Sequence, residues 1–484
     1  MPNAVNAVAI MLGIARDASW EIRYFDTWHY RKGQDSMQDR EASGEFKPCA
    51  GRPIGTKSAA GIPVEFQEAV DSFMPDVLAI SCISSEYEFL MSWFGNVRIS
   101  AGTTVVIGGM HAVLNPDAVI ASGMFDVVCV GEGEMVFAEI LRRKEHGDDL
   151  SGIAGTYFRD RAGGGIVRNE RRRLLSSGEL WKIKPDYSLF DERAFVFPFD
   201  GKLYRRFNFE GGRGCPFSCS YCGNAALKNA YKGLGPFLRL RPLDSVKAEV
   251  TRLISENGVE LFYFQDECFL AHPLAWLEEL AAWYGKEVRK PFIVQTRPET
   301  VTAEKIDLLK RMSAPFFQVS MGVESGSERI LFDVCNRNTP IQEIIRAFDL
   351  LRERDVRTCA FFMLGFPYET REDVFKSITL CRRLRPTVAI ASIFQPLPGQ
   401  TLRDLCIREG FITGKEPLPT FTSDSILSMP QLSRSEIAGL RRCFMLYATL
   451  DEKHHPDIER CEKDYEGNKD LYEWLVRLRW ESTG

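Results

Sequence analysis

Two blocks in which short apolar runs alternate with helix-like segments most strongly constrain how this chain can fold. In the first block, residues 77–83, 104–107 and 127–130 are apolar runs of strand length, while residues 66–73 and 87–99 have helical spacing. Buried strands that alternate with helices pair in parallel, because each helix provides the crossover to the next strand. We therefore expect an α/β domain with a doubly wound, Rossmann-like sheet whose ligands bind where the strands end.

The second block contains six further strand candidates, separated by helical segments such as residues 243–256 and 371–384. This pattern favours a partial (β/α)6 barrel of the TIM type with its site at the C-terminal ends of the strands. The strand candidates are residues 206–210, 261–265, 292–296, 316–322, 358–364 and 389–394. The expected organisation is an α/β domain over 1–150, a hairpin and linker over 151–200, the partial barrel over 201–405 and a helical C-terminal domain over 406–484.

Charge and hydropathy exclude several classes of protein. The net charge is −5 and no long basic block occurs, which argues against broad electrostatic binding to nucleic acid. No stretch of eighteen apolar residues and no secretory signal is found, so we expect a cytoplasmic protein without a membrane-spanning helix. Most of the thirteen cysteines stand singly in apolar surroundings, which is typical of buried free thiols rather than of a disulfide framework.

Three cysteines differ from the others. Cys215, Cys219 and Cys222 have the spacing C-x3-C-x2-C within the glycine-containing segment GGRGCPFSCSYCGN. Three thiolates this close can hold one soft metal centre. A structural zinc site normally needs a fourth protein ligand, and the next cysteine, Cys268, lies 46 residues further on. A four-iron cluster held by three cysteines would instead leave one iron open to a substrate or cofactor.

The triplet resembles the signature of the radical S-adenosylmethionine (SAM) superfamily. That resemblance implies a [4Fe–4S] cluster held by the three cysteines, with SAM bound at the open iron and cleaved to a 5′-deoxyadenosyl radical. Segments FQDE, QTRPE, MGVESGSERIL, LGFPYET and FQPLPGQTL follow in the order the family has them. The residues that the resemblance places around SAM are Tyr221, Asp266, Glu267, Arg297, Glu324, Ser325 and Gly365.

Each of these polar residues also has a simpler interpretation. Asp266 or Glu267 could be a helix cap or a surface acid, and Arg297 could form a salt bridge at the barrel rim. Cys268 could face the cavity or be a buried inert thiol.

The first domain resembles the cobalamin-binding (B12-binding) domain that precedes many radical SAM barrels, through ISCISSEYEF, VVIGGMHAVLNPDAV and FDVVCVGEGE. The motif D-x-H-x-x-G is absent, so His111 is not assigned as a cobalt ligand. We expect the first strand of such a domain to be missing before residue 11, and the alternative is a domain that only packs on the barrel or presents substrate. Residues expected near cobalamin are Ser81, Ser84, Gly108, Gly109, Gly131 and Glu132.

The resemblance implies a cobalamin-dependent radical SAM enzyme, with a methyltransferase acting on an unactivated carbon of a small-molecule or peptide natural product as the first choice. An electron donor such as flavodoxin or ferredoxin is the expected partner. Cyclisation, ring contraction or oxidation without methyl transfer is the alternative. A methylthiotransferase is disfavoured because the N-terminal cysteines, Cys49, Cys82 and Cys129, are scattered. A non-catalytic metal-binding protein stays open, and no catalytic side chain is assigned.

Overall fold

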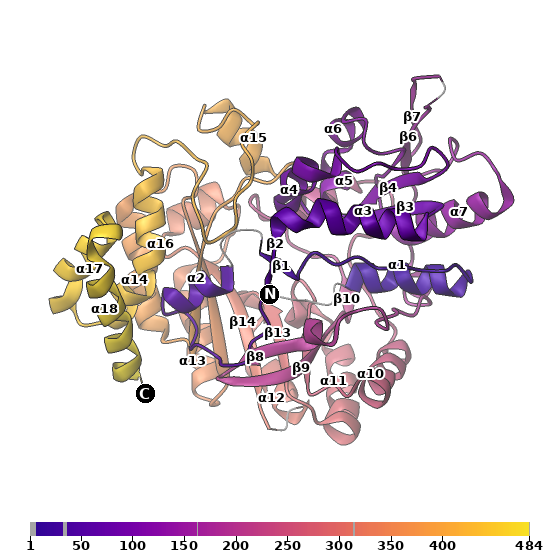
Figure 1. Cartoon of the computed structure of the whole chain (residues 1–484). Coiled ribbons are helices and arrows are strands. Elements are labelled where there is room, and N and C mark those ends of the chain that lie inside the picture. Colours follow the sequence, from indigo (N-terminus) through magenta and orange to yellow (C-terminus); the bar gives the residue numbers. More distant parts are fainter. Residues whose placement is uncertain (1–5, 32–35, 162, 313–314, 484) are drawn as a thin grey trace.

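The computed structural model describes residues 6–31, 36–161, 163–312 and 315–483 (Figure 1). All thirteen cysteines lie in these ranges as free thiols, and ten of them are buried. None of the helices in the described ranges is long and apolar enough to cross a bilayer.

The N-terminal sheet has five strands in the order β3-β4-β5-β6-β7. The first three, β3 (Val77–Ser81), β4 (Thr104–Gly108) and β5 (Val127–Cys129), are parallel. The hairpin β6 (Thr156–Arg159) and β7 (Ile166–Arg168) adds to β5 in antiparallel pairing. The hairpin expected in the connector is thus part of this sheet, because its first strand satisfies the free edge of β5.

Six helices accompany this sheet, and Ile62, Phe66, Val105, Ile107 and Val128 belong to its core. Asn6–Asp17 form α1, which packs on α7. The described residues in the region where the first strand is expected to be missing therefore form a helix. Residues 1–5 lie outside the described ranges. The helices are α1, α3 (Ile62–Phe73), α4 (Ser84–Phe94), α5 (Met110–Leu114), α6 (Pro116–Ala121) and α7 (Gly133–His146).

The second sheet has seven strands in the order β16-β15-β14-β13-β12-β9-β8. Six of them are parallel and follow one another along the chain, as expected for a partial barrel. They are β9 (Lys202–Phe209), β12 (Leu261–Phe264), β13 (Phe292–Thr296), β14 (Phe317–Glu324), β15 (Arg357–Leu364) and β16 (Val388–Ile393). The seventh, β8 (Val196–Phe199), pairs antiparallel with β9 and was not expected.

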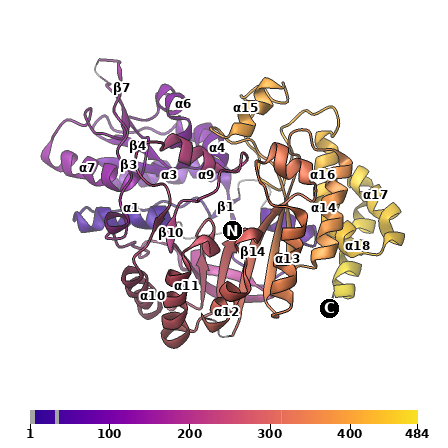
Figure 2. The same cartoon turned by 180° about the vertical axis from the view of Figure 1, so that it is seen from behind.

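Helices line the outside of this curved sheet, which Figure 2 shows from behind. The strand-connecting helices are α10 (Leu243–Asn257), α11 (Leu274–Trp283), α12 (Ala303–Met312), α13 (Ile341–Arg352) and α14 (Arg371–Leu384). The C-terminal helices, orange to yellow in Figure 1, are α15 (Thr401–Arg408), α16 (Arg434–Thr449), α17 (His455–Lys463) and α18 (Lys469–Thr483). α16 packs on both α14 and β16.

A segment from the N-terminus closes the free edge of β16. Residue Arg40 lies on α2 (Ser36–Ala42), which follows β1 (Tyr30–Arg31) and precedes β2 (Lys57–Ser58), the parallel partner of β1. Arg40 and Arg441 each donate to the Ala391 carbonyl oxygen at 3.2 Å, and both bind the Glu45 carboxylate, at 2.6 and 2.9 Å. Because the arginines bind a carbonyl oxygen on the edge strand and Glu45 offsets their charge, this edge is not free to pair with another strand.

Candidate functional site

The cysteine loop crosses the C-terminal end of the barrel sheet. It leaves a short antiparallel pair formed by β10 (Gly212–Arg213) and β11 (Arg239–Leu240), and it ends at Cys222, immediately before α9 (Gly223–Ala230). Gly214 has φ +95°, and a Cβ there would overlap the Phe237 carbonyl oxygen. Only glycine fits this turn without strain, because the backbone has both a left-handed φ and a close neighbour.

Three backbone contacts hold the loop against a segment that follows β14. The Ser220 N–H donates to the Cys335 carbonyl oxygen at 3.0 Å, and the Asn336 side chain donates to the Ser218 carbonyl oxygen at 2.9 Å. The Ser220 hydroxyl donates to the Val334 carbonyl oxygen at 2.5 Å. The positions of the cysteines are therefore set by residues more than a hundred positions away in the sequence.

The three sulfur atoms fit a soft iron–sulfur centre. Burial raises the pKa of Cys215 to about 12 and that of Cys222 to about 11, so both are thiols at neutral pH until a metal displaces the proton. Arg297 Nη1 donates to the Cys219 sulfur at 3.1 Å, an arrangement that stabilises a thiolate. No three His, Cys, Asp or Glu side chains in the described ranges are placed to share one metal ion. In a cluster each thiolate binds its own iron, so closer spacing is not required.

The two acids after β12 point to different neighbours. Asp266 is buried and accepts from the Gly211 N–H at 2.9 Å and from His272 Nε2 at 2.5 Å, so its carboxylate holds the ends of β9 and β12 together. Glu267 is exposed to solvent. Burial raises its pKa, an Asn224 hydrogen bond opposes this, and Asp266 adds to it. Glu267 in turn raises the pKa of Cys215 and Cys222, and it therefore lies beside the cysteine loop.

Arg297 connects the third strand to the cysteine loop. Besides Cys219, its guanidinium binds Thr339 Oγ1 at 3.1 Å and Glu299 Oε1 at 2.5 Å, and it lies 3.9 Å from the centre of the Phe217 ring. Its Nε is buried without a partner among the described residues. Arg297 therefore forms both a salt bridge, with Glu299, and the contact with Cys219.

A second buried arginine, Arg337, was not predicted from the sequence. Its Nη1 lies 3.2 Å from the Tyr221 hydroxyl and 3.3 Å from Glu324 Oε1, and its Nη2 donates to the Gly322 carbonyl oxygen. Its Nε has no partner in the described part of the chain. Arg337 thus joins two of the predicted SAM residues. The only local signal was its place in NRNTP, directly after MGVESGSERIL.

Glu324 has an unusual backbone at the end of β14. Its φ is +67°, and the register of β14 against β15 shifts between Gly322 and Glu324. Burial raises the pKa of its carboxyl group, while Arg337 and a hydrogen bond with Tyr221 oppose the shift. A strained non-glycine residue that carries a buried carboxyl group is typical of a functional position.

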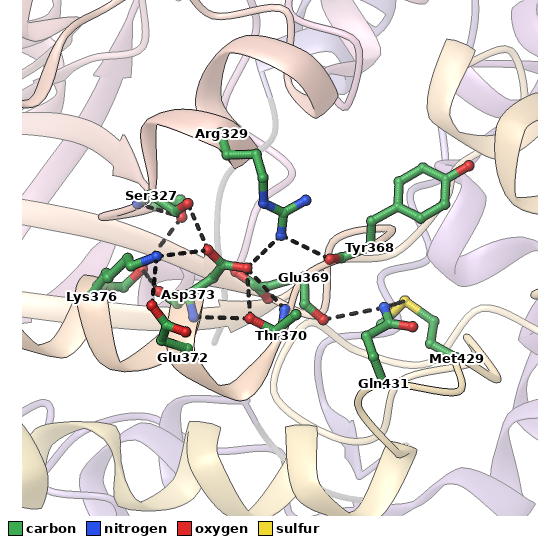
Figure 3. Close-up of polar contacts among 12 residues, drawn as sticks. Ser327, Arg329, Tyr368, Glu369, Thr370, Glu372, Asp373, Lys376, Met429 and Gln431 are labelled. Carbon is green, nitrogen blue, oxygen red and sulfur yellow. Dashed lines mark hydrogen bonds and ion pairs between the residues drawn. The ribbon is translucent and has the colours of Figure 1, made fainter.

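The loops after β14 and β15 are joined by the Asp373 carboxylate (Figure 3). It accepts from the Ser327 hydroxyl at 2.7 Å, the Thr370 hydroxyl at 2.8 Å and Arg329 Nη2 at 2.5 Å. Burial alone would raise the pKa of Asp373, but these three donors hold it well below its usual range. The network fixes the MGVESGSERIL loop on the first turn of α14.

The other two predicted SAM residues lie inside these loops. The Ser325 hydroxyl accepts from the Ser327 N–H at 3.2 Å and lies 3.4 Å from the Ser377 hydroxyl. Gly365 has φ +82°, and its N–H donates to the buried Glu369 carboxylate at 2.5 Å. Both residues shape the site, and the described contacts of the Ser325 side chain are to protein.

The predicted cobalamin residues gather at the C-terminal ends of β3, β4 and β5. Ser81 is exposed there, and the neighbouring Ile83 keeps 53% of its surface exposed. A Cβ on Gly131 would meet no atom within 4 Å among the described residues, whereas Gly109, with φ +96°, is packed against Cys82. Gly108 ends β4 between these turns. An open glycine turn and an exposed apolar side chain at the same edge of one sheet suit a large planar ligand.

Ser84 and His111 form a buried pair near this edge. His111 Nδ1 lies 3.1 Å from the Ser84 hydroxyl, and its ring stacks on Tyr87 with 4.0 Å between centroids. Burial, and secondarily Arg403, lowers the pKa of His111 to about 4, so the imidazole is neutral at pH 7.

The Glu132 carboxylate is occupied by contacts with residues that follow the N-terminal domain in the chain. Its carboxylate accepts from Arg239 at 2.8 and 2.7 Å, from Arg213 at 3.2 Å and from the Leu175 N–H at 3.1 Å. Burial opposes ionisation, yet the two arginines lower the pKa of Glu132. Its place near cobalamin stays a prediction.

The two domains also meet through α5 and α9. A Cβ on Gly223 would lie 3.1 Å from the Met110 sulfur, and one on Gly399 would lie 3.2 Å from Leu114. The helix that begins after Cys222 therefore packs directly on the N-terminal domain.

Family models match both halves of this arrangement. The B12 binding domain model covers residues 56–141, and the radical SAM superfamily model covers residues 209–381. The chain carries a B12-binding domain and a radical SAM domain. It is thus a radical SAM enzyme, and its two domains imply a [4Fe–4S] cluster, SAM and cobalamin as cofactors, as predicted.

Curated relatives include both methyltransferases and cyclases. The chain is 25% identical to the uncharacterized methyltransferase PH0819 of Pyrococcus horikoshii, over 78% of this chain and 79% of that protein. It is 27% identical to cytidylyl-2-hydroxyethylphosphonate methyltransferase of Streptomyces wedmorensis, over 78% of this chain and 75% of that protein. Anaerobic magnesium-protoporphyrin IX monomethyl ester cyclase of Cereibacter sphaeroides is 26% identical, over 70% of this chain and 55% of that protein.

Solved structures agree with the fold. TsrM of Kitasatospora setae, a radical SAM methyltransferase with cobalamin and a [4Fe–4S] cluster bound, has a TM-score of 0.63 at 15% identity, covering 100% of this chain and 97% of that one. The cobalamin-dependent radical enzyme OxsB has a TM-score of 0.60 at 12% identity, covering 100% of this chain and 69% of that one. These similarities support the arrangement of the domains and leave the roles of individual residues as proposals.

Proposed function

We propose that this protein is a cobalamin-dependent radical SAM methyltransferase that acts on an unactivated carbon of a small-molecule or peptide natural product. The observation that carries the proposal is the contact of α9, which begins at the cysteine loop, with α5 of the B12-binding domain. This contact brings the ligand-binding edges of the two domains toward one another, as a reaction that uses both cofactors requires. The names of two relatives support methyl transfer.

In this proposal, Cys215, Cys219 and Cys222 hold the cluster. When bound, the cluster and SAM supply radical chemistry, and cobalamin supplies a methyl group. Arg297 keeps Cys219 oriented through its Nη1 contact and has a free Nε for a ligand carboxylate.

The remaining SAM contacts come from the carboxyl and phenol groups around the loop. Glu267, which lies beside the cysteine loop, would accept from the amino group of SAM. Arg337 positions Glu324 and Tyr221, which face the ribose and adenine in the superfamily resemblance. Buried, paired groups of this kind exclude water and keep fixed orientations.

A second candidate is a cobalamin radical enzyme that cyclises or oxidises its substrate without methyl transfer, because the relatives also include cyclases. A small electron-transfer protein and a cytoplasmic setting belong to either version of the proposal.

The test uses SAM labelled in its methyl group, with protein reconstituted without oxygen. Label that appears in a product, and disappears with Cys219→Ala, supports the methyltransferase. Cleavage of SAM that consumes substrate without label in any product contradicts methyl transfer and favours the second candidate.

A further inference from the structure

A cavity of about 300 Å³ near the N-terminal ends of β15 and β16 is lined by four arginines, Arg352, Arg382, Arg383 and Arg385. Arg352 is the last residue of α13, which precedes β15. The other three lie at the end of α14 and in the turn that leads to β16. The cysteine loop crosses the opposite end of the sheet, so the length of β15, about 25 Å, separates the loop from this cavity.

Backbone carbonyl oxygens orient two of these guanidinium groups. Arg352 Nη1 donates to the Leu384 carbonyl oxygen at 3.1 Å, which joins the end of α13 to the end of α14. Arg382 Nε donates to the Tyr447 carbonyl oxygen at 2.8 Å, and its Nη2 donates to the Leu450 carbonyl oxygen at 2.5 Å. Contacts of this kind at helix ends hold an arginine in place, but a carbonyl oxygen does not neutralise its charge.

The positive charge of the four arginines exceeds the negative charge beside them. In the described part of the chain, only Asp349 forms salt bridges with them: its two oxygen atoms accept from Arg383 at 3.2 and 2.9 Å, and Arg352 also binds it. Asp451 interacts with Arg382 over a longer distance. Four guanidinium groups therefore share one closely bound carboxylate, and the cavity attracts anions.

The arginine side chains of this wall are accessible to solvent. The side chains of Arg352 and Arg383 keep 45% and 51% of their surface exposed. Arg385 is exposed, and its side chain makes no hydrogen bond or salt bridge within the described ranges. Its φ is +51°, a conformation that favours glycine or asparagine at the end of a helix, yet the chain has an arginine there. A side chain kept at a strained position without a protein partner is available for a ligand.

The shape and charge of the cavity favour a small molecule with phosphate groups. Guanidinium groups bind carboxylates and phosphates through paired N–H donors. One carboxylate is already satisfied by two of these arginines, as Asp349 shows, whereas a diphosphate carries several charges on oxygen atoms that all four can share. A volume of about 300 Å³ is at the lower limit of ligand cavities, which suits a compact ligand rather than a nucleic acid strand.

We propose that this cavity, walled by Arg352, Arg382, Arg383 and Arg385, is a binding site for the phosphate groups of a small anion. A bound anion would neutralise the arginines and hold the ends of α13, α14 and α16 together, because the arginines bind carbonyl oxygens at these ends. Since the site lies across the sheet from the cysteine loop, binding can be measured without turnover. Its failure would leave the proposed methyl transfer untouched.

The probe is inorganic pyrophosphate, titrated by calorimetry into the full-length protein with its cluster reconstituted and with SAM present to occupy the open iron. We expect saturable binding at a single site per chain. Acetate, which carries one negative charge, should bind at least about tenfold more weakly at the same ionic strength. The iron content after each titration verifies that pyrophosphate has not removed the cluster.

Two variants and a control assign the binding to the arginines. Arg385→Gln removes a guanidinium group that has no partner among the described residues, so the fold should persist while the affinity for pyrophosphate falls about tenfold. Arg385→Glu adds a carboxylate to the cavity and should abolish binding. Arg98→Gln is the matched control, because Arg98 is 83% exposed in the N-terminal domain and its loss changes the net charge equally. This control should bind as the parent does.

Three results would overturn the inference: no saturable binding of pyrophosphate, equal affinity for acetate, or equal effects of Arg385→Gln and Arg98→Gln. Vesicles that contain phosphatidic acid, and a short single-stranded RNA, are further probes of the same arginines. If either binds more tightly than pyrophosphate and loses that binding in Arg385→Glu, the arginines belong to a membrane-binding or nucleic-acid-binding surface and the small-anion site is wrong.

Discussion

Replacing Glu132 by glutamine should weaken the contact between the N-terminal domain and the barrel and so lower the free energy of unfolding. The Glu132 carboxylate receives two hydrogen bonds from Arg239, one from Arg213 and one from the Leu175 N–H, and with Glu134, which also binds Arg213, it links the start of α7 to the barrel. Glutamine has the same shape, but it turns an amide donor toward a guanidinium and leaves Arg239 without its counter-charge. Breaking a buried ion pair on one side costs about 3–5 kcal/mol, which is the loss we expect in the free energy of unfolding.

The assay is urea unfolding followed by tryptophan fluorescence, with Glu145→Gln as the control. Glu145 is exposed on α7, the helix that Glu132 precedes, so its replacement should change the free energy of unfolding by less than about 0.5 kcal/mol. Because the pKa of Glu132 is lowered in the folded protein, its contribution is complete above the unfolded-state pKa and is lost as the pH falls through the folded value. Acidification should therefore reduce the difference in the free energy of unfolding between the parent protein and Glu132→Gln. A Glu132→Gln protein as stable as the control, yet unable to bind cobalamin, would refute the ion-pair account and place Glu132 at the corrinoid.

Three further substitutions test the site. Arg337→Lys should weaken SAM binding about tenfold, measured by equilibrium dialysis, while the iron content stays unchanged. The reason is that lysine cannot bridge Tyr221 and Glu324 as a guanidinium does. A loss of iron would assign Arg337 to the cluster loop instead. Gly214→Ala should abolish iron incorporation, whereas Gly233→Ala, which has a similar φ but open space around it, should keep it; equal iron contents would contradict the steric argument. Asp373→Asn should lower the free energy of unfolding by about 1–3 kcal/mol and weaken SAM binding. The control is Glu372→Gln, because Glu372 is exposed on the same helix. No difference between these two variants would show that the hydrogen bonds of Asp373 are not needed for stability or for SAM binding.

Strands and helices with strong local signals are those the sequence places correctly. Residues 292–296 are predicted as a strand and form β13, because an uninterrupted apolar run suits a buried parallel strand. Residues 371–384 are predicted as a helix and form α14, which starts with a capping box between Thr370 and Asp373.

Elements that depend on distant partners are not predictable in this way. β8 contains Pro198, which argues against a strand, yet an antiparallel edge position tolerates proline. The closure of the β16 edge depends on Arg40 and Glu45 meeting Arg441, which lies almost four hundred residues further along the chain. No local periodicity contains that pairing.

The candidate site likewise contains residues that a local motif predicts and residues that only the fold brings together. The cysteine spacing is a local motif and predicts a loop that the structure places at the end of the barrel strands. Arg337 was missed because its role depends on Tyr221 and Glu324 converging on it in space. Asp266 follows a predicted strand, but only the fold shows that its carboxylate binds Gly211 and His272.

The most direct test of the account is the metal and corrinoid content of the protein purified without oxygen and reconstituted with iron, sulfide and hydroxocobalamin. We expect about four irons and about one corrinoid per chain, with the iron lost when Cys215, Cys219 and Cys222 are replaced by alanine and the corrinoid retained. Iron that survives the triple replacement would contradict the cluster assignment. A full complement of iron without corrinoid would contradict the cobalamin-dependent reaction.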